Sequence, residues 1–242
     1  MRSLTGSLTS CCVYAAIITA GLAAGRAGAN MIGPPQVFTI ANQKVGDGDH
    51  LADATISFGL SNGQLTVSLD NTSSMHAANE LIRSVSFKLF NSSRAITATG
   101  QLTALHNGRQ EKINKNGSYT FSSVTLGGLA DPWRIRRNSS AYILGTGGAK
   151  DMVIAPPVGN AYRANKTIDG NPRHNPFLAD TPTFNMQLCG INSVTQVRDV
   201  MVGFGTGSLN VPASETSIPE PAAAALLAVG GLVLLLKRKR SR

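Results

Sequence analysis

The stretch of sequence that decides the fold is ATISFGLSNGQLTVSLDN, residues 54–71. Apolar residues occupy every second position on both sides of its centre, at Ile56, Phe58, Leu60, Leu65, Val67 and Leu69. Side chains on a strand alternate between its two faces, so this spacing places all six on one face. Asn62-Gly63 tolerates the positive φ that a tight hairpin turn requires. The stretch therefore predicts an antiparallel hairpin with one buried face and one face in water.

The same alternation recurs through the rest of residues 30–210. It is clearest at Val85, Phe87, Leu89, Phe184, Met186, Leu188, Val200, Val202 and Phe204. The segment MHAANELIRSV, residues 75–85, is the best helix candidate in this region, but it is too short for three amphipathic turns. About eight to ten short strands without helical crossovers predict an all-β domain, an antiparallel β-sandwich of jelly-roll type.

Two segments depart from this pattern. Residues 155–183 contain five prolines and several Asn and Gly residues, and they predict a long ordered loop. We expect its hydrogen-bonding and aromatic residues to fix this loop to the sandwich, with a ligand site as the alternative; they are Tyr162, Asn165, Asn171, His174, Asn175 and Phe177. Residues 211–218 are polar and short, and they predict a linker.

The formal net charge of +9 is concentrated at the two ends of the chain. Between residues 30 and 217 there are 15 Lys and Arg residues against 12 Asp and Glu residues, a net charge of only +3. Five further cations follow the last apolar run. Such a distribution is typical of membrane topology signals, so we expect no nucleic-acid partner.

The first 29 residues have the pattern of a secretory signal peptide. An apolar run covers residues 11–24, and Ala27 and Ala29 supply the small side chains that signal peptidase requires at its cleavage site. This leader is expected to form a signal helix and to be removed. Cleavage would remove two of the three cysteines and leave only Cys189, so the hydrophobic core has to stabilise the fold without a disulfide.

The chain ends in SIPEPAAAALLAVGGLVLLLKRKRSR, residues 217–242. The apolar residues 222–236 would form a membrane helix of about 22 Å, shorter than the roughly 30 Å hydrocarbon core of a bilayer. The basic residues that follow predict a cytoplasmic C-terminus before processing. Pro219 and Pro221 hold Glu220 in extended backbone just before this helix, where a protease can bind it.

This arrangement resembles the PEP-CTERM sorting signal of bacterial envelope proteins, over residues 219–242. The resemblance implies cleavage by an exosortase, a membrane cysteine protease, near Pro219, Glu220 and Pro221. Several segments of the preceding domain also resemble a group of uncharacterised PEP-CTERM ectodomains; these segments are LTVSLDNTS, SVSFKLF, DMVIAPPVGNAYRANKTIDGNPRHNPFL and VGFGTG. That group implies no activity.

Three carboxylates, Asp47, Asp49 and Asp53, are candidate ligands for Ca²⁺. They are clustered on a loop with glycine, and Ca²⁺ binds six to eight oxygen atoms. The spacing does not complete an EF-hand, and the alternative is a solvated acidic loop.

The only tryptophan, Trp133, stands beside Arg134, Arg136 and Arg137. Guanidinium charge and ring stacking together favour a contact with acidic polysaccharide. The alternative interpretation is a strand whose outward face is cationic.

No motif of a nucleophile, a phosphate-binding loop or a dinucleotide site occurs in the chain, and we expect no enzyme and no resident cofactor. The sequence favours an exported, cell-envelope or extracellular protein with a structural or adhesive role. A carbohydrate-binding module, assisted by Ca²⁺ or not, is the alternative, and its partner would be an exopolysaccharide. A secreted hydrolase is the third hypothesis.

Overall fold

The computed structural model describes residues 35–216, except 47–49, 62, 75–76, 98, 160, 163–167, 169–170, 193 and 208. The predicted signal peptide and the predicted sorting tail lie outside the described residues. Within this part of the chain, no helix has both the length and the apolar character needed to span a bilayer.

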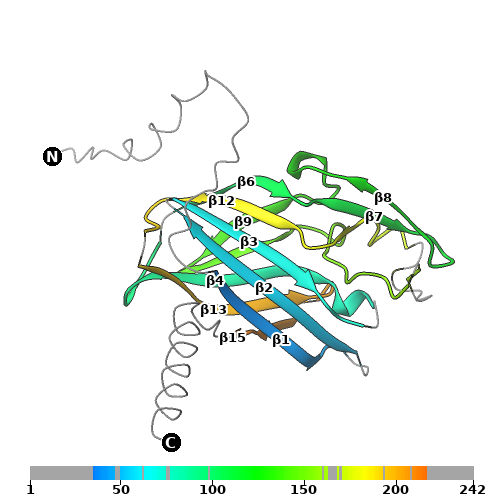
Figure 1. The fold of residues 1–242 in the computed structure, drawn as a ribbon, viewed down its shortest axis with the longest axis horizontal. Coiled ribbons are helices and arrows are strands. Elements are labelled where there is room, and N and C mark those ends of the chain that lie inside the picture. Colours follow the sequence, from blue (N-terminus) through cyan, green and yellow to red (C-terminus); the bar gives the residue numbers. More distant parts are fainter. Residues whose placement is uncertain are drawn as a thin grey trace, which may run out of the picture. The chain divides into compact units, whose positions relative to one another are not determined.

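The described part of the chain is all-β, and its paired strands are antiparallel, as the alternation predicted. The first sheet has the strand order β15-β1-β2-β3-β12-β6, with bounds Ser214–Thr216, Gln36–Lys44, Leu51–Ser61, Gln64–Asn71, Thr183–Leu188 and Gly100–His106. The second sheet has the order β14-β13-β4-β10-β9, with bounds Leu209–Pro212, Thr195–Phe204, Ile82–Asn91, Ala141–Thr146 and Trp133–Asn138. In Figure 1 the strands β2 and β3 pass over β4 and β13.

The remaining elements are short. A third sheet has the order β11-β7-β8, with bounds Phe177–Ala179, Arg109–Ile113 and Tyr119–Ser123. The two-residue strand β5, Arg94–Ala95, pairs with β4, and the described residues include the 3₁₀ turns η2 at Ala78–Glu80 and η3 at Leu126–Gly128. With these short strands, the described residues contain more strands than the predicted eight to ten. The short strands were not predicted because two to five residues carry too little alternation to be recognised in the sequence.

The hairpin predicted at residues 54–71 is confirmed. Ser61 pairs with Gln64, so two residues, 62 and 63, connect β2 to β3, and Gly63 has a φ of 72°. The apolar positions on both strands are buried, apart from Leu60, which is half-buried.

Aromatic contacts join the first two sheets into one core. Phe38 and Phe58 of the first sheet pack edge to face, and Phe58 packs in turn on Phe87 of β4, at 5.1 Å between ring centroids. Phe87 stacks on Tyr142 of β10. These side chains belong to a single buried cluster that takes members from both sheets. The inward faces of the two sheets therefore pack on each other in a sandwich-like arrangement.

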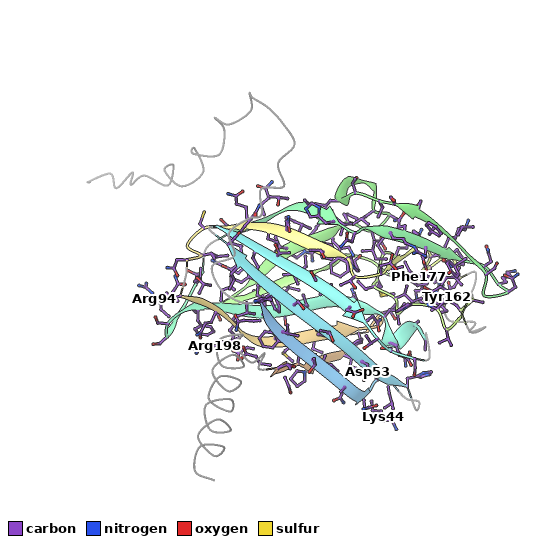
Figure 2. All side chains as sticks on the ribbon, viewed as in Figure 1. Lys44, Asp53, Arg94, Tyr162, Phe177 and Arg198 are labelled. Carbon is purple, nitrogen blue, oxygen red and sulfur yellow. The ribbon has the colours of Figure 1, made fainter. Side chains whose placement is uncertain are left out.

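A second, smaller cluster lies under the third sheet. It contains Leu81, Ile113, Met152, Ile154, Tyr162, Ile168, Phe177 and Ala179, and Tyr162 and Phe177 are labelled near β7 in Figure 2. Tyr162 donates its hydroxyl to the buried Glu111. Burial, followed by that hydrogen bond, raises the pKa of Tyr162 far above its ordinary value, so the phenol stays protonated. The described part of the proline-rich segment is therefore fixed to the domain, as the sequence predicted, but the segment is not all loop, because residues 177–179 form β11.

The amide of Asn71 connects all three sheets at the end of β3. Its Nδ2 donates to the carbonyls of Glu80 and Val153, both at 2.9 Å, and its Oδ1 accepts the N–H of Ser73. Glu80 lies two residues before β4 begins at Ile82, while Val153 bridges Ile82 of β4 to Leu178 of β11. Asn71 is 1% exposed, so water cannot replace these bonds.

The ordered domain extends beyond the predicted boundary at residue 210. Residues 209–212 form β14 on the second sheet, and residues 214–216 form β15 on the first. Residues 211–212 and 214–216 of the expected linker therefore belong to the sheets, with Thr216 paired to Val37.

Replacing Asn71 with Ala would leave the buried Glu80 carbonyl and the buried Ser73 N–H without partners, while the Val153 carbonyl would keep only its bond from the Ile82 N–H. Because each unpaired group costs about 1–3 kcal/mol, we expect the free energy of unfolding to fall by about 2 kcal/mol or more. Chemical denaturation measures this loss. Asn114→Ala is the control, since the Asn114 side chain bonds an exposed Ser118 hydroxyl; it should cost less than about 1 kcal/mol. Equal losses in the two variants would contradict the role given to Asn71.

Candidate functional site

A row of residues with small side chains in its middle crosses the outer face of the second sheet. Across β9, β10, β4, β13 and β14, the paired residues are Arg134, Gly145, Ser84, Gly203 and Asn210. Neighbouring strands lie about 4.8 Å apart, so the row is about 19 Å long. A hollow of about 280 Å³ lies over these residues. We call this feature the trough.

Glycine lies on both sides of Ser84, and a Cβ atom at either position would meet Ser84. A Cβ atom on Gly145 would lie 2.7 Å from Ser84 Cβ and 3.1 Å from the carbonyl oxygen of Arg83. A Cβ atom on Gly203 would lie 2.3 Å from Ser84 Oγ. Backbone therefore forms much of the trough floor, and the Ser84 side chain rises between the two glycines.

A β-bulge sets the position of Arg83 beside this floor. Gly203 pairs with Ser84, but the next residue, Phe204, pairs with Ile82, so Arg83 is the extra residue on β4. Bulges of this kind change the direction of a side chain. Arg83 Nη1 donates to the carbonyls of Thr206 and Gly207, at 2.9 and 3.3 Å, which holds the guanidinium against the turn after β13.

The next row of the sheet forms one side of the trough. In this row Arg136 pairs with Ile143, Ile143 with Ser86, and Ser86 with Met201. Ile143 is half-buried, and Met201 is 37% exposed. This side therefore combines a third cation with apolar surface.

The three arginines of the trough carry charge that the described residues do not neutralise. The ion pairs found in this part of the chain involve other residues, namely His50 with Glu80, Lys88 with Asp199, and Arg109 with Glu111 and Asp180. No carboxylate lines the hollow. Uncompensated cations on one face attract anions, so the trough can bind negatively charged groups along its length.

The structure places Trp133 in the core and not on the surface. Its side chain is 3% exposed, its ring stacks on Phe184 at 4.6 Å between centroids, and its Nε1 donates to the carbonyl of Asp151 at 2.8 Å. The stacking expected from Trp133 is therefore made to Phe184, and not offered to a ligand. Arg134 and Arg136 are exposed on the opposite face of β9, and their part in ligand binding stays a prediction.

The predicted calcium ligands are described only in part. Asp53 is half-buried on β2, and its Oδ1 accepts the N–H of Asn42 at 2.7 Å; Figure 2 labels it near Lys44. Asp47 and Asp49 lie outside the described residues. The part of the chain that is described contains no group of three His, Cys, Asp or Glu residues placed to bind a metal ion. The residues of the two predicted cleavage sites also lie outside the described residues; they are Ala27, Ala29, Pro219, Glu220 and Pro221.

Comparison with family models, with curated proteins and with solved structures finds no match to this chain.

Sequence reasoning found two members of the trough and missed the others. The alternation in β9 separates Arg134 and Arg136 from Trp133, and this signal was available in the sequence. Gly145 and Gly203 each lie beside Ser84 only through strand register, which joins residues 61 and 119 positions apart in the chain. Their sequence neighbours carry no sign of this contact.

The two glycines should respond differently to a change at Ser84. Gly145→Ala would bring Cβ against Ser84 Cβ and the backbone, so we expect a loss of about 1–3 kcal/mol in the free energy of unfolding. Gly203→Ala mainly meets Ser84 Oγ, which can rotate away, so it should cost less. Adding Ser84→Ala should reduce the loss of stability caused by Gly203→Ala and leave the loss caused by Gly145→Ala nearly unchanged. Denaturation of the single and double variants measures these differences. If Ser84→Ala restored the same stability to both glycine variants, the contacts described for Gly145 and Gly203 would be wrong.

Proposed function

We propose that this chain is an exported envelope protein whose domain binds acidic polysaccharide along the trough, and that this binding gives it an adhesive role in the cell surface or extracellular matrix. One observation carries the proposal. The trough is a row of residues that crosses five strands and is small at its three central positions, with Arg134 at one end, Arg83 and Arg136 beside it, and no carboxylate in its lining.

The chemistry of the trough suits a polysaccharide with carboxylate or sulfate groups. Guanidinium groups bind such oxyanions with two parallel hydrogen bonds. The Ser84 hydroxyl can exchange hydrogen bonds with sugar hydroxyls, while Ile143 and Met201 offer apolar surface to the C–H faces of the rings. An extended chain lying across the strands could contact all of these groups in succession.

Two other functions have less support. Nucleic-acid binding by stacking requires exposed aromatic rings, and the residues that line the trough include none. Hydrolysis of a glycosidic bond requires paired carboxyl groups, which this lining also lacks. The proposal therefore assigns binding to the trough, and no reaction.

Polysaccharide binding is tested with the double variant Arg134→Gln/Arg136→Gln. Removing two charge-assisted contacts should weaken the binding of polygalacturonate to the mature protein by about tenfold or more, and added salt should weaken the wild-type complex. Arg137→Gln is the matched control, because Arg137 lies on the same strand but alternates to the other face. Isothermal titration or co-sedimentation measures the affinity. No binding by the wild type, or equal loss in the control, would contradict the proposal.

The proposal of export rests on residues 217–242. Pro219-Glu220-Pro221, the apolar run and the basic end follow one another in the order of a sorting signal that exosortase processes. Residue 219 follows soon after β15, which ends at Thr216. The folded domain thus ends close to the proposed cleavage site.

Changing Glu220 to Ala, or deleting residues 237–242, should leave unprocessed precursor in the membrane fraction. The first change removes the charged residue of the proposed recognition motif, and the second removes the basic residues expected to hold the tail on the cytoplasmic side. Immunoblotting of membrane and medium fractions, with mass spectrometry of the mature C-terminus, follows the processing. Glu215→Ala, on β15, is the control and should be processed normally. Normal release of both test variants would refute sorting by this tail.

A further inference from the structure

A second hollow, of about 500 Å³, lies on the third sheet. It is lined by Gln110, Lys112, Thr120, Phe121, Ser122, Lys150, Pro172, Asn175 and Pro176. Its volume is in the range of pockets that bind small molecules. We call it the lysine hollow. None of the residues beside the trough takes part in it, so the two features are separate.

The floor of the lysine hollow is one face of a two-stranded ladder. Gln110 of β7 pairs with Ser122 of β8, and Lys112 pairs with Thr120. Residues two apart on a strand share a face, so these four side chains point to the same side. Glu111 and Ile113 point to the other side, where both are buried.

Hydrogen bonds of Asn175 hold one wall in place. Its Oδ1 accepts the N–H of Ile113 at 2.8 Å, and its Nδ2 lies within hydrogen-bond distance of the carbonyls of Ile113, Ile168 and Asn171. Asn175 is 8% exposed, so these bonds are shielded from water. They join the wall containing Pro172 and Pro176 to the last residue of β7.

Lys150 lies in the segment next to this wall, because the following residue, Asp151, donates its N–H to the carbonyl of Pro176 at 2.8 Å. The backbone N–H of Lys150 donates to Asp131 Oδ2 at 2.7 Å, and the carboxylate of Asp151 accepts the N–H of Asp131 at 2.8 Å. Asp151 is fully buried. Burial raises the pKa of its carboxyl, while the hydrogen bonds from Asp131 and Gln110 act in the opposite direction. Lys150 is therefore attached to a fixed segment.

The same buried carboxylate orients the amide of Gln110. Gln110 Nε2 donates one of its two hydrogens to Asp151 Oδ1, which fixes the amide and makes Gln110 Oε1 available to the hollow as an acceptor. The lining thus offers two ammonium groups, two hydroxyls and one carbonyl acceptor, and it contains no carboxylate. Neither Lys112 nor Lys150 takes part in an ion pair with another described residue.

We propose that the lysine hollow binds a single acidic sugar residue of the uronic acid class. The two lysines bind its carboxylate, and Gln110 Oε1 accepts a sugar hydroxyl. The hydroxyls of Thr120 and Ser122 complete the polar contacts. An inorganic anion such as sulfate would match the lysines, but it carries no donor for Gln110 Oε1. The acceptor therefore selects a ligand that has hydroxyl groups as well as negative charge.

The experiment is a titration of the mature protein with glucuronate, glucose and sulfate, followed by isothermal calorimetry or by amide chemical shifts. Glucuronate should bind most tightly. Lys112→Gln and Lys150→Gln should each weaken glucuronate binding about tenfold, and Lys115→Gln should not change it. Lys115 is an exposed lysine beyond the end of β7 that does not line the hollow. Circular dichroism and thermal unfolding confirm that each variant is folded.

The outcomes separate this proposal from the one made for the trough. Loss of glucuronate binding in the two lysine variants, with normal binding in Arg134→Gln/Arg136→Gln, supports the lysine hollow. Loss only in the arginine variant, equal binding of sulfate and glucuronate, or no binding of glucuronate at all would overturn it. The affinity for polygalacturonate, measured in parallel, tests the trough independently of these results.

Discussion

The buried amide of Asn71 is the contact on which the arrangement of the sheets depends. It bonds to the carbonyl of Glu80, two residues before β4 begins, and to the carbonyl of Val153, which connects β4 to the third sheet. Inside a protein such polar groups must find partners, because an unpaired buried carbonyl costs about 1–3 kcal/mol. The start of β4 is thereby fixed relative to the first sheet. The bulge at Arg83 and the neighbouring floor residue Ser84 follow within four residues of Glu80.

Both proposed sites follow from that placement. The trough lies where β4 passes between two strands that carry glycine, and the lysine hollow lies on the sheet that Val153 joins to β4. Each site uses outward side chains of strands whose inward side chains form a core. The two sites differ in chemistry, since arginines beside a long row suit a polyanion and the lysine hollow suits one sugar unit. Together they describe a domain that could hold a polysaccharide at two separate points.

The sequence predicted the elements better than the sites. Period-two alternation and the turn at Gly63 were sufficient for the β2–β3 hairpin and for the apolar faces of β4, β12 and β13. Trp133 was misplaced because its neighbours are charged, although the alternation along β9 already assigned it to the face opposite Arg134 and Arg136. The register that brings Gly145 and Gly203 beside Ser84, and the bond that orients Gln110, join residues distant in the chain. No local pattern encodes such contacts.

The central claim is that the outer face of the second sheet binds an acidic polysaccharide. Chemical-shift mapping of the ¹⁵N-labelled mature protein with an oligogalacturonate tests it most directly, because it reports where the ligand lies. We expect the largest shifts on the amides of Ser84, Gly145 and Gly203, with smaller shifts on the first sheet. Shifts confined to the first sheet, or no shifts at saturating ligand, would contradict it.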